Sequence, residues 1–192
     1  MREYDRIAEW YATDRSRTIG VAQALTMADA LSPCSRILDL GCGNGVPITE
    51  ALVNAGHRVV GLDTSAAMLR RFRASLPETP AVRGDARRCP FPNGCFDAAI
   101  SWGMMFHLSP GDQAAVVESL SAVLKRGAPF LFTATEMEDA GDAGITGTMN
   151  GVMFRYYAVP SYRRLVAEHG FVLVNMYDDP GVSTYYLAHK AW

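Results

Sequence analysis

Three glycines at alternate positions constrain this chain more than any other feature of its sequence. Gly41, Gly43 and Gly45 follow the mostly apolar run Arg-Ile-Leu-Asp-Leu at 36–40 and precede a segment with apolar residues at helical spacing. Glycine takes positive φ without a Cβ clash, and a helix that begins after the turn offers unpaired N–H groups. The stretch therefore predicts a strand, a tight turn and a helix, with a ligand lying directly against the backbone of the turn.

The spacing of these glycines narrows the class of ligand. A dinucleotide fingerprint has glycines at its first, third and sixth positions, whereas the sixth position here is Val46. With Asp39 two residues before Gly41, the stretch resembles the acid-x-G-x-G-x-G loop of class I S-adenosylmethionine-dependent methyltransferases. The resemblance implies S-adenosyl-L-methionine as cofactor and S-adenosyl-L-homocysteine as product. The loop residues that it assigns to cofactor binding are Asp39, Gly41, Cys42, Gly43, Asn44 and Gly45, with Asp39 either contacting the ammonium group or tying the loop together.

Length and composition favour one soluble domain. A chain of 192 residues can bury one sizeable core and is too short for two ordinary domains, so we expect a single domain over 1–192. No run approaches the roughly 20 apolar residues of a membrane span, and the charged amino terminus predicts a cytoplasmic protein that does not bind membranes. The net charge of −2 gives no reason to expect a nucleic-acid partner.

The cysteines and histidines are dispersed along the chain. Cysteines stand at 34, 42, 89 and 95 and histidines at 57, 107, 169 and 189, without a C-x-x-C pair or a histidine at ligand spacing. We therefore expect free thiols and no dedicated metal site.

Alternating strand and helix patterns predict the fold class. Short apolar runs at 36–40, 57–63, 81–84, 96–101 and 129–135 are separated by helical patterns, which implies parallel strands with helices on both faces. Residues 171–178 and 183–190, joined by a turn around Pro180, are expected to form a hairpin that adds one antiparallel strand. The prediction is an α/β fold, a Rossmann-like doubly wound sheet of seven strands, mostly parallel, and the methyltransferase fold ends in the same way.

Further candidate cofactor residues follow the predicted strands, because open α/β sheets bind ligands at the carboxyl ends of their strands. Asp63, 22 positions beyond Gly41, suits two ribose hydroxyls, and Thr64 and Ser65 after it join the cofactor-binding set while capping the next helix. Asp85 is assigned to the adenine amine, with the Ala86 N–H against the ring. Its alternative role is a turn aspartate that caps its own loop.

The residues after the fourth parallel strand are expected near the methyl group. Ser101, Trp102 and Gly103 complete the cofactor-binding set, with Trp102 either stacked on the adenine, facing the sulfonium, or buried in the core. His107 is the one histidine near the expected pocket and is our candidate catalytic base, with packing as the alternative.

Two segments are expected to close the site. Residues 1–32 carry two helical patterns that resemble the lid of small-molecule methyltransferases, and the resemblance assigns Tyr11 and Arg15 to the cofactor. Residues 136–160 form a likely insertion on the substrate side, where Met149, Phe154, Tyr156 and Tyr157 are the candidate substrate-binding residues.

These features predict transfer of a methyl group from S-adenosylmethionine to a small-molecule acceptor by in-line displacement, in which the protein mainly aligns the reactants. We expect a monomer or a homodimer. Two alternatives stay open at this point: a module that binds the cofactor without catalysis, and an NAD(P)-dependent oxidoreductase, which Val46 and the lack of a second domain disfavour.

Overall fold

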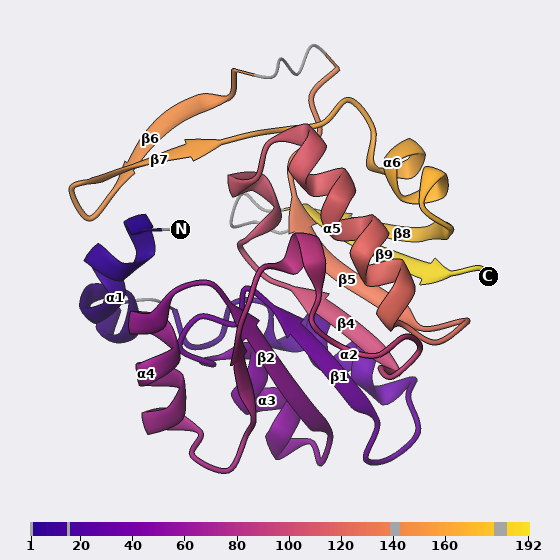
Figure 1. Cartoon of the computed structure of the whole chain (residues 1–192), viewed down its shortest axis with the longest axis horizontal. Helices are drawn as coiled ribbons and strands as arrows, with labels where there is room; N and C mark the ends of the chain where they lie inside the picture. The colour runs from indigo at the N-terminus through magenta and orange to yellow at the C-terminus, as the bar shows by residue number, and fades with distance from the viewer. Residues whose placement is uncertain (1, 15, 139–142, 179–183) are drawn as a thin grey trace.

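A seven-stranded sheet organises the computed structural model, which describes residues 2–14, 16–138, 143–178 and 184–192 (Figure 1). The strands lie in the order β3-β2-β1-β4-β5-β9-β8. Their bounds are β1 Arg36–Leu40, β2 Arg58–Asp63, β3 Ala81–Arg83, β4 Ala98–Ser101, β5 Pro129–Ala134, β8 Phe171–Asp178 and β9 Thr184–Lys190. The first five strands pair in parallel, and β9 lies antiparallel between β5 and β8. The predicted fold class is confirmed.

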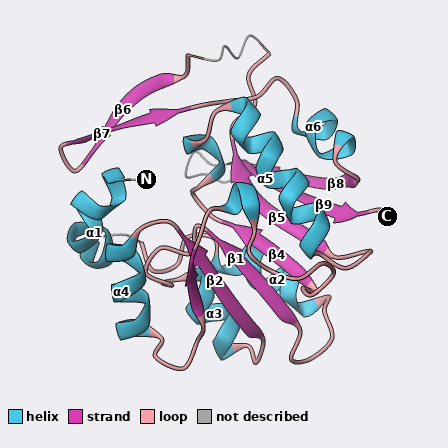
Figure 2. Cartoon of the chain, in the orientation of Figure 1, coloured by secondary structure: helices cyan, strands magenta, loops and turns pink. Residues whose placement is uncertain are grey.

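Helices cover both faces of this sheet (Figure 2). Side chains of α2 (Val21–Asp29) and α3 (Ile48–Asn54) pack with Ile37, Val59 and Ile100 on one face. Side chains of α5 (Pro110–Val123) and α6 (Tyr162–Glu168) pack with Leu38, Leu40 and the phenylalanines of β5 on the other. Because parallel strands joined by helices are buried on both sides, β1, β4 and β5 are almost wholly apolar, as the sequence indicates.

One helix and two short turns complete the edge where the site lies. The helix α4 (Ala66–Ser75) follows β2 and buries Leu69 and Phe72 against Cys42 of the glycine turn. The 3₁₀ turns η1 (Ala86–Arg88) and η2 (Met105–His107) follow β3 and β4. Asp63, Asp85 and Trp102 thereby come to the same edge, since the carboxyl ends of parallel strands meet there.

The segment 136–160 contains structure that the sequence patterns did not predict. Its described residues include a two-stranded antiparallel sheet of β6 (Ile145–Met149) and β7 (Val152–Tyr156), joined through Asn150 and Gly151, both with positive φ. We expected an insertion here but did not predict its strands, although Asn150-Gly151 is a typical hairpin turn and Val152 and Phe154 are good strand formers. The hairpin is accompanied by apolar contacts of Val152 and Phe154 with Ile7.

The amino-terminal helix α1 (Arg2–Asp14) lies between α4 and this hairpin (Figure 1). The next helix, α2, begins at Val21, after Gly20, which takes φ 79° at the N-cap. No helix in the described part of the chain is long and apolar enough to cross a membrane.

Candidate functional site

The backbone of the glycine turn has the conformation that the sequence predicts. Gly41, Gly43 and Gly45 have φ values of 72°, 56° and 81°, a region that favours glycine. A Cβ on Gly41 would lie 2.8 Å from Met104, and one on Gly45 would lie 2.7 Å from Leu76, whereas one on Gly43 would meet nothing within 4 Å. Gly43 is therefore the position at which a ligand can approach the turn most closely.

Asp39 lies beneath this turn and is 2 % exposed. Its Oδ2 accepts a hydrogen bond of 2.5 Å from the Thr49 hydroxyl on α3. The pKa of the Asp39 carboxyl is raised to about 7, chiefly by burial; the Thr49 hydrogen bond acts against this rise, and the nearby Asp63 carboxylate contributes to it. Asp39 is thus a buried acid whose charge a neighbouring cation would stabilise.

Asp63 joins the end of β2 to the glycine turn. Its Oδ2 accepts from the Gly43 N–H at 2.9 Å and its Oδ1 from the Ser65 N–H at 2.7 Å. Burial raises the pKa of the Asp63 carboxyl, while these backbone donors act in the opposite direction. Each carboxylate oxygen has a second lone pair, so Asp63 can still accept from two ligand hydroxyls.

Ser65 and Thr64 have different surroundings. The Ser65 side chain is buried and caps α4 by accepting from the Met68 N–H at 3.1 Å, while Thr64 lines the cavity described below. Of the two residues that follow Asp63, Ser65 therefore caps a helix and Thr64 lines the cavity.

Asp85 takes the local role that we weighed as its alternative. Its Oδ1 accepts from the Arg87 N–H at 3.0 Å, and both of its oxygens bind the Arg87 guanidinium. This guanidinium holds the pKa of the Asp85 carboxyl below its usual range, and it also bonds Asp112 at 2.9 Å. Asp85 and the buried Ala86 nevertheless line the cavity, so their contact with an adenine stays a prediction.

The residues after β4 differ in their surroundings, and their contact with a cofactor stays a prediction. Trp102 lines the cavity and packs against Tyr185 with ring centroids 4.6 Å apart, so it belongs to both the site and the core. The Gly103 N–H donates to the Thr133 hydroxyl at 2.8 Å. Ser101 is fully buried, and its hydroxyl has no hydrogen-bond partner in the described part of the chain.

His107 lies between the amino-terminal helix and the hairpin. Its Nδ1 is 3.1 Å from the Arg155 carbonyl and its Nε2 is 3.0 Å from the Tyr4 hydroxyl. Because a carbonyl only accepts, Nδ1 carries the proton, and the neutral ring then accepts from Tyr4 at Nε2. This tautomer presents a basic nitrogen beside the cavity that Tyr4 and His107 both line.

Two adjoining cavities run along this edge of the sheet. The larger, of about 230 Å³, extends from Asp63, Asp85 and Ala86 to Trp102, His107 and Leu108, and the smaller, of about 30 Å³, lies over Asp39 and the glycine turn. Gly41, Gly43, Tyr11 and Trp102 line both. Cys42, Asn44 and Gly45 line only the smaller, and together the two make one elongated space with acids at both ends.

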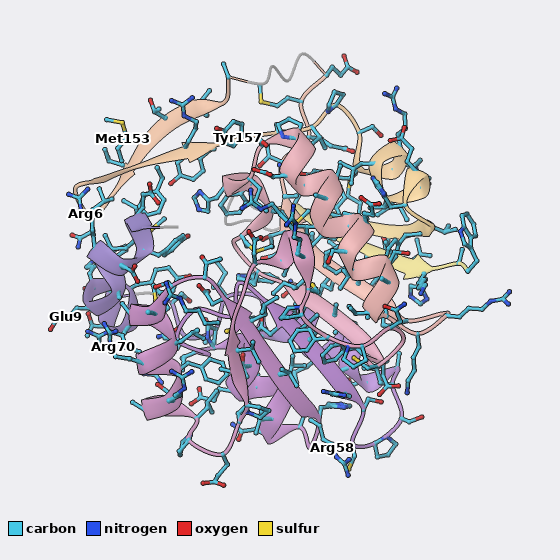
Figure 3. All side chains as sticks on the ribbon, in the orientation of Figure 1. Arg6, Glu9, Arg58, Arg70, Met153 and Tyr157 are labelled. Atoms are coloured by element: carbon cyan, nitrogen blue, oxygen red, sulfur yellow. The ribbon has the colours of Figure 1, made fainter. Side chains whose placement is uncertain are left out.

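The four candidate substrate residues lie behind the cavity wall. Met149, Phe154 and Tyr156 pack with Ile7 of α1, and Phe154 and Tyr156 also contact the His107 ring. The Tyr157 N–H donates to the Phe106 carbonyl at 2.7 Å, and Figure 3 places this residue beside the hairpin. None of the four lines either cavity in the described structure, so substrate contact stays a prediction for them. Arg15 lies outside the described residues.

Sequence patterns did not assign several cavity residues to the site. Arg87, Met104 and Met68 line the larger cavity but were not among the predicted site residues. Tyr4 stood in the predicted lid helix but outside our candidate set. The sequence signal for Tyr4 was its spacing from Tyr11, which places both side chains on one face of the helix. Among the described residues, no group of His, Cys, Asp and Glu could hold a metal ion.

Comparisons with known proteins agree with this geometry. Residues 37–127 match the family model described as "Methyltransferase domain". An uncharacterized methyltransferase of Synechocystis is 35% identical over 101 residues, which are 53% of this chain and 47% of that protein. The chain therefore spans about half the length of this curated relative.

Solved structures share the fold at low sequence identity. The 1,6-didemethyltoxoflavin-N1-methyltransferase of Burkholderia thailandensis, solved with S-adenosylhomocysteine, has a TM-score of 0.76 at 17% identity, covering 100% of this chain and 85% of that one. The S-adenosylmethionine-bound amino pentose methyltransferase CalS10 of Micromonospora echinaspora has a TM-score of 0.76 at 18% identity, covering 97% and 96%. The match over residues 37–127, the strand order and the glycine turn are all similar to those of class I S-adenosylmethionine-dependent methyltransferases.

Proposed function

We propose that this protein binds S-adenosylmethionine along the two joined cavities and transfers its methyl group to a small, uncharged acceptor. The observation that carries the proposal is the open space over Gly43, with Asp39 and Asp63 at its two sides. Asp39 would face the ammonium group and Asp63 the ribose hydroxyls, since carboxylates suit both groups. The cofactor supplies a methyl group on a sulfonium, and the protein aligns it and excludes water.

The acceptor class follows from the charges around the larger cavity. Its charged side chains, Asp63, Asp85 and Arg87, lie at the end that we assign to the nucleoside. Trp102, Met104, His107, Leu108 and Tyr4 line the other end without a formal charge. Burying an unpaired charge there would be costly, so an uncharged acceptor fits best. An acceptor that arrives with a proton on nitrogen or oxygen could give it to His107 Nε2.

Calorimetry with S-adenosylhomocysteine tests the cofactor site. Asp63→Ala is expected to weaken binding by roughly 1.5–3 kcal/mol, the range for hydrogen bonds to a charged group. Asp97→Ala is the control, because Asp97 pairs with Lys125 and the Arg36 N–H and lines neither cavity. An Asp63→Ala protein with wild-type affinity would remove Asp63 from the site.

Two further measurements separate the alternatives. Binding of NADP but not of S-adenosylhomocysteine would favour the oxidoreductase. Transfer of labelled methyl groups from S-adenosylmethionine to low-molecular-weight acceptors in a cell extract would support catalysis. Tight cofactor binding without transfer to any such pool would favour the non-catalytic module.

A further inference from the structure

An acidic residue of the amino-terminal helix is hydrogen-bonded to the start of another helix. Asp5 Oδ1 accepts from the Ser65 hydroxyl at 2.5 Å and from the Ala67 N–H at 3.1 Å. These donors belong to the N-cap and first turn of α4, where a carboxylate is favourable because the N–H groups there lack partners within the helix. The Ser65 hydrogen bond holds the pKa of the Asp5 carboxyl below its usual range. The two helices are thus joined through an ionised side chain.

The same serine connects Asp5 to the acid that we assign to the ribose. The Ser65 backbone N–H donates to Asp63 Oδ1 at 2.7 Å, and the second Asp63 oxygen accepts from the Gly43 N–H at 2.9 Å. One continuous chain of hydrogen bonds therefore runs from Asp5 through Ser65 and Asp63 to the glycine turn. A displacement of α1 would disturb the residue that orients Asp63.

The other sides of α1 face the cavity and the hairpin. Tyr4 and Tyr11, seven residues apart and on one helical face, line the larger cavity. Ile7 is 1 % exposed and packs with Val152 and Phe154 of β7. The helix therefore covers the cavity between α4 and the hairpin, and Asp5 is its polar attachment on the α4 side.

We propose that Asp5 is a positioning residue for the cofactor: it latches α1 onto the start of α4, which closes the cavity and fixes the Ser65–Asp63 pair. The identity of the ligand rests on the proposed function, while the latch itself does not. Loss of the carboxylate leaves the cavity residues in place but lets α1 open, so a bound nucleoside escapes faster. Its association rate should not fall, because an unlatched α1 opens at least as readily for entry.

The test compares Asp5→Ala with Glu9→Ala. Both variants remove one exposed acid from α1, but the Glu9 carboxylate makes no hydrogen bond within the described part of the chain and lies on the outer side of the helix (Figure 3). S-adenosylhomocysteine is the probe, with affinity from calorimetry, dissociation rate from stopped-flow fluorescence, and hydrogen exchange of residues 2–14 with and without the probe. For Asp5→Ala we expect Kd to rise about threefold to thirtyfold, the range for loss of a helix cap, through a faster dissociation rate. Probe-induced protection of 2–14 should fall, and Glu9→Ala should match wild type.

Asp5→Asn provides a graded second variant, because its amide oxygen can still accept from the Ala67 N–H while the charge is lost. It should give an intermediate dissociation rate, and it serves in place of Asp5→Ala if that protein does not fold.

Wild-type dissociation in both Asp5 variants would overturn the proposal. So would weaker binding accompanied by faster exchange throughout the sheet, because that pattern indicates general destabilisation rather than an opened helix. If wild-type protein binds no S-adenosylhomocysteine, the proposed function fails. The latch is then still tested by exchange of 2–14 without ligand, which must be faster in Asp5→Ala than in Glu9→Ala.

Discussion

At the scale of single residues, the hydrogen bonds of His107 come from two different elements. The Arg155 carbonyl of β7 accepts from Nδ1, and the Tyr4 hydroxyl of α1 donates to Nε2. With the proton on Nδ1, Nε2 is the nitrogen that can act as a base, and the Tyr4 hydroxyl occupies its lone pair. The rings of Tyr4 and Tyr156 also contact His107. The base is thus controlled by the position of α1.

Tyr4→Phe should remove the hydrogen bond to His107 Nε2 and leave the proton on Nδ1, where the Arg155 carbonyl still accepts it. Nitrogen-15 NMR of the histidine ring measures both effects, as a changed Nε2 chemical shift and an unchanged tautomer. Tyr177→Phe is the matched control, since Tyr177 lies on β8 and does not line this cavity. An unchanged Nε2 chemical shift in Tyr4→Phe would mean that the hydroxyl does not act on His107.

Two aspartates show how far residue patterns could define the site. The position of Asp63 beside the glycine turn was predictable because it needs only a strand end and a fixed distance from that turn, both of which are visible in the sequence. Asp85 was predicted by the same logic, but its side chain is held by Arg87, two residues on, and Arg87 is also bound by Asp112 from α5. A contact between residues 25 positions apart leaves no periodic signal in one sequence.

At the scale of elements, the parallel strands and their helices followed from the alternation of strand and helix patterns, whereas the β6–β7 hairpin was not predicted. The pairing of β6 with β7 is stabilised by contacts with Ile7, about 145 residues earlier in the chain. The hairpin also carries a local signal that we did not use, because Val152, Phe154 and Tyr156 are good strand formers and Asn150-Gly151 is a typical two-residue hairpin turn. What the sequence pattern does not reveal is the distant partner, Ile7, against which this hairpin packs.

The start of α2 makes a second element-scale contact that can be tested. A Cβ on Gly20 would lie 2.2 Å from the Trp102 ring, and the residue has φ 79°. Gly20→Ala should destabilise the protein by about 2 kcal/mol or more, since overpacking adds to backbone strain. It should also weaken S-adenosylhomocysteine binding, because Trp102 lines both cavities. Urea unfolding and calorimetry measure the two effects.

Gly94→Ala is the control for strain alone. Gly94 has φ 60°, and a Cβ there would meet nothing within 4 Å. We expect a cost of about 1 kcal/mol and unchanged ligand affinity. If the two variants behave alike, the contact between Gly20 and Trp102 contributes nothing to the site.

At the scale of the whole molecule, the ligand-free fold carries an electrostatic cost that a cationic ligand can relieve. Burial raises the pKa of Asp39 to about 7, and Asp63, whose pKa is raised as well, lies close enough to add to this effect. The folded protein therefore keeps a proton on Asp39 at pH values where the unfolded chain has lost it. By linkage, the contribution of Asp39 to the free energy of unfolding falls as pH rises from about 4 to 7 and is constant above. Asp5, Asp85 and Asp97 have lowered pKa values, so their contributions change only below about pH 4.

Urea unfolding at pH 5 and pH 8 should show this cost. Wild type is expected to lose about 2 kcal/mol more than Asp39→Asn between these pH values, because the neutral amide keeps an acceptor for Thr49 without the titration. A ligand ammonium group stabilises the charged carboxylate, so the affinity of wild type for S-adenosylhomocysteine should rise between pH 6 and pH 8, and that of Asp39→Asn should not. Equal pH dependence of stability in the two proteins would show that Asp39 ionises normally in the fold. The two proteins could instead differ in the pH dependence of their stability but not in that of their affinity. That result would place the ammonium group away from Asp39, whose role would then be to tie the glycine turn to α3.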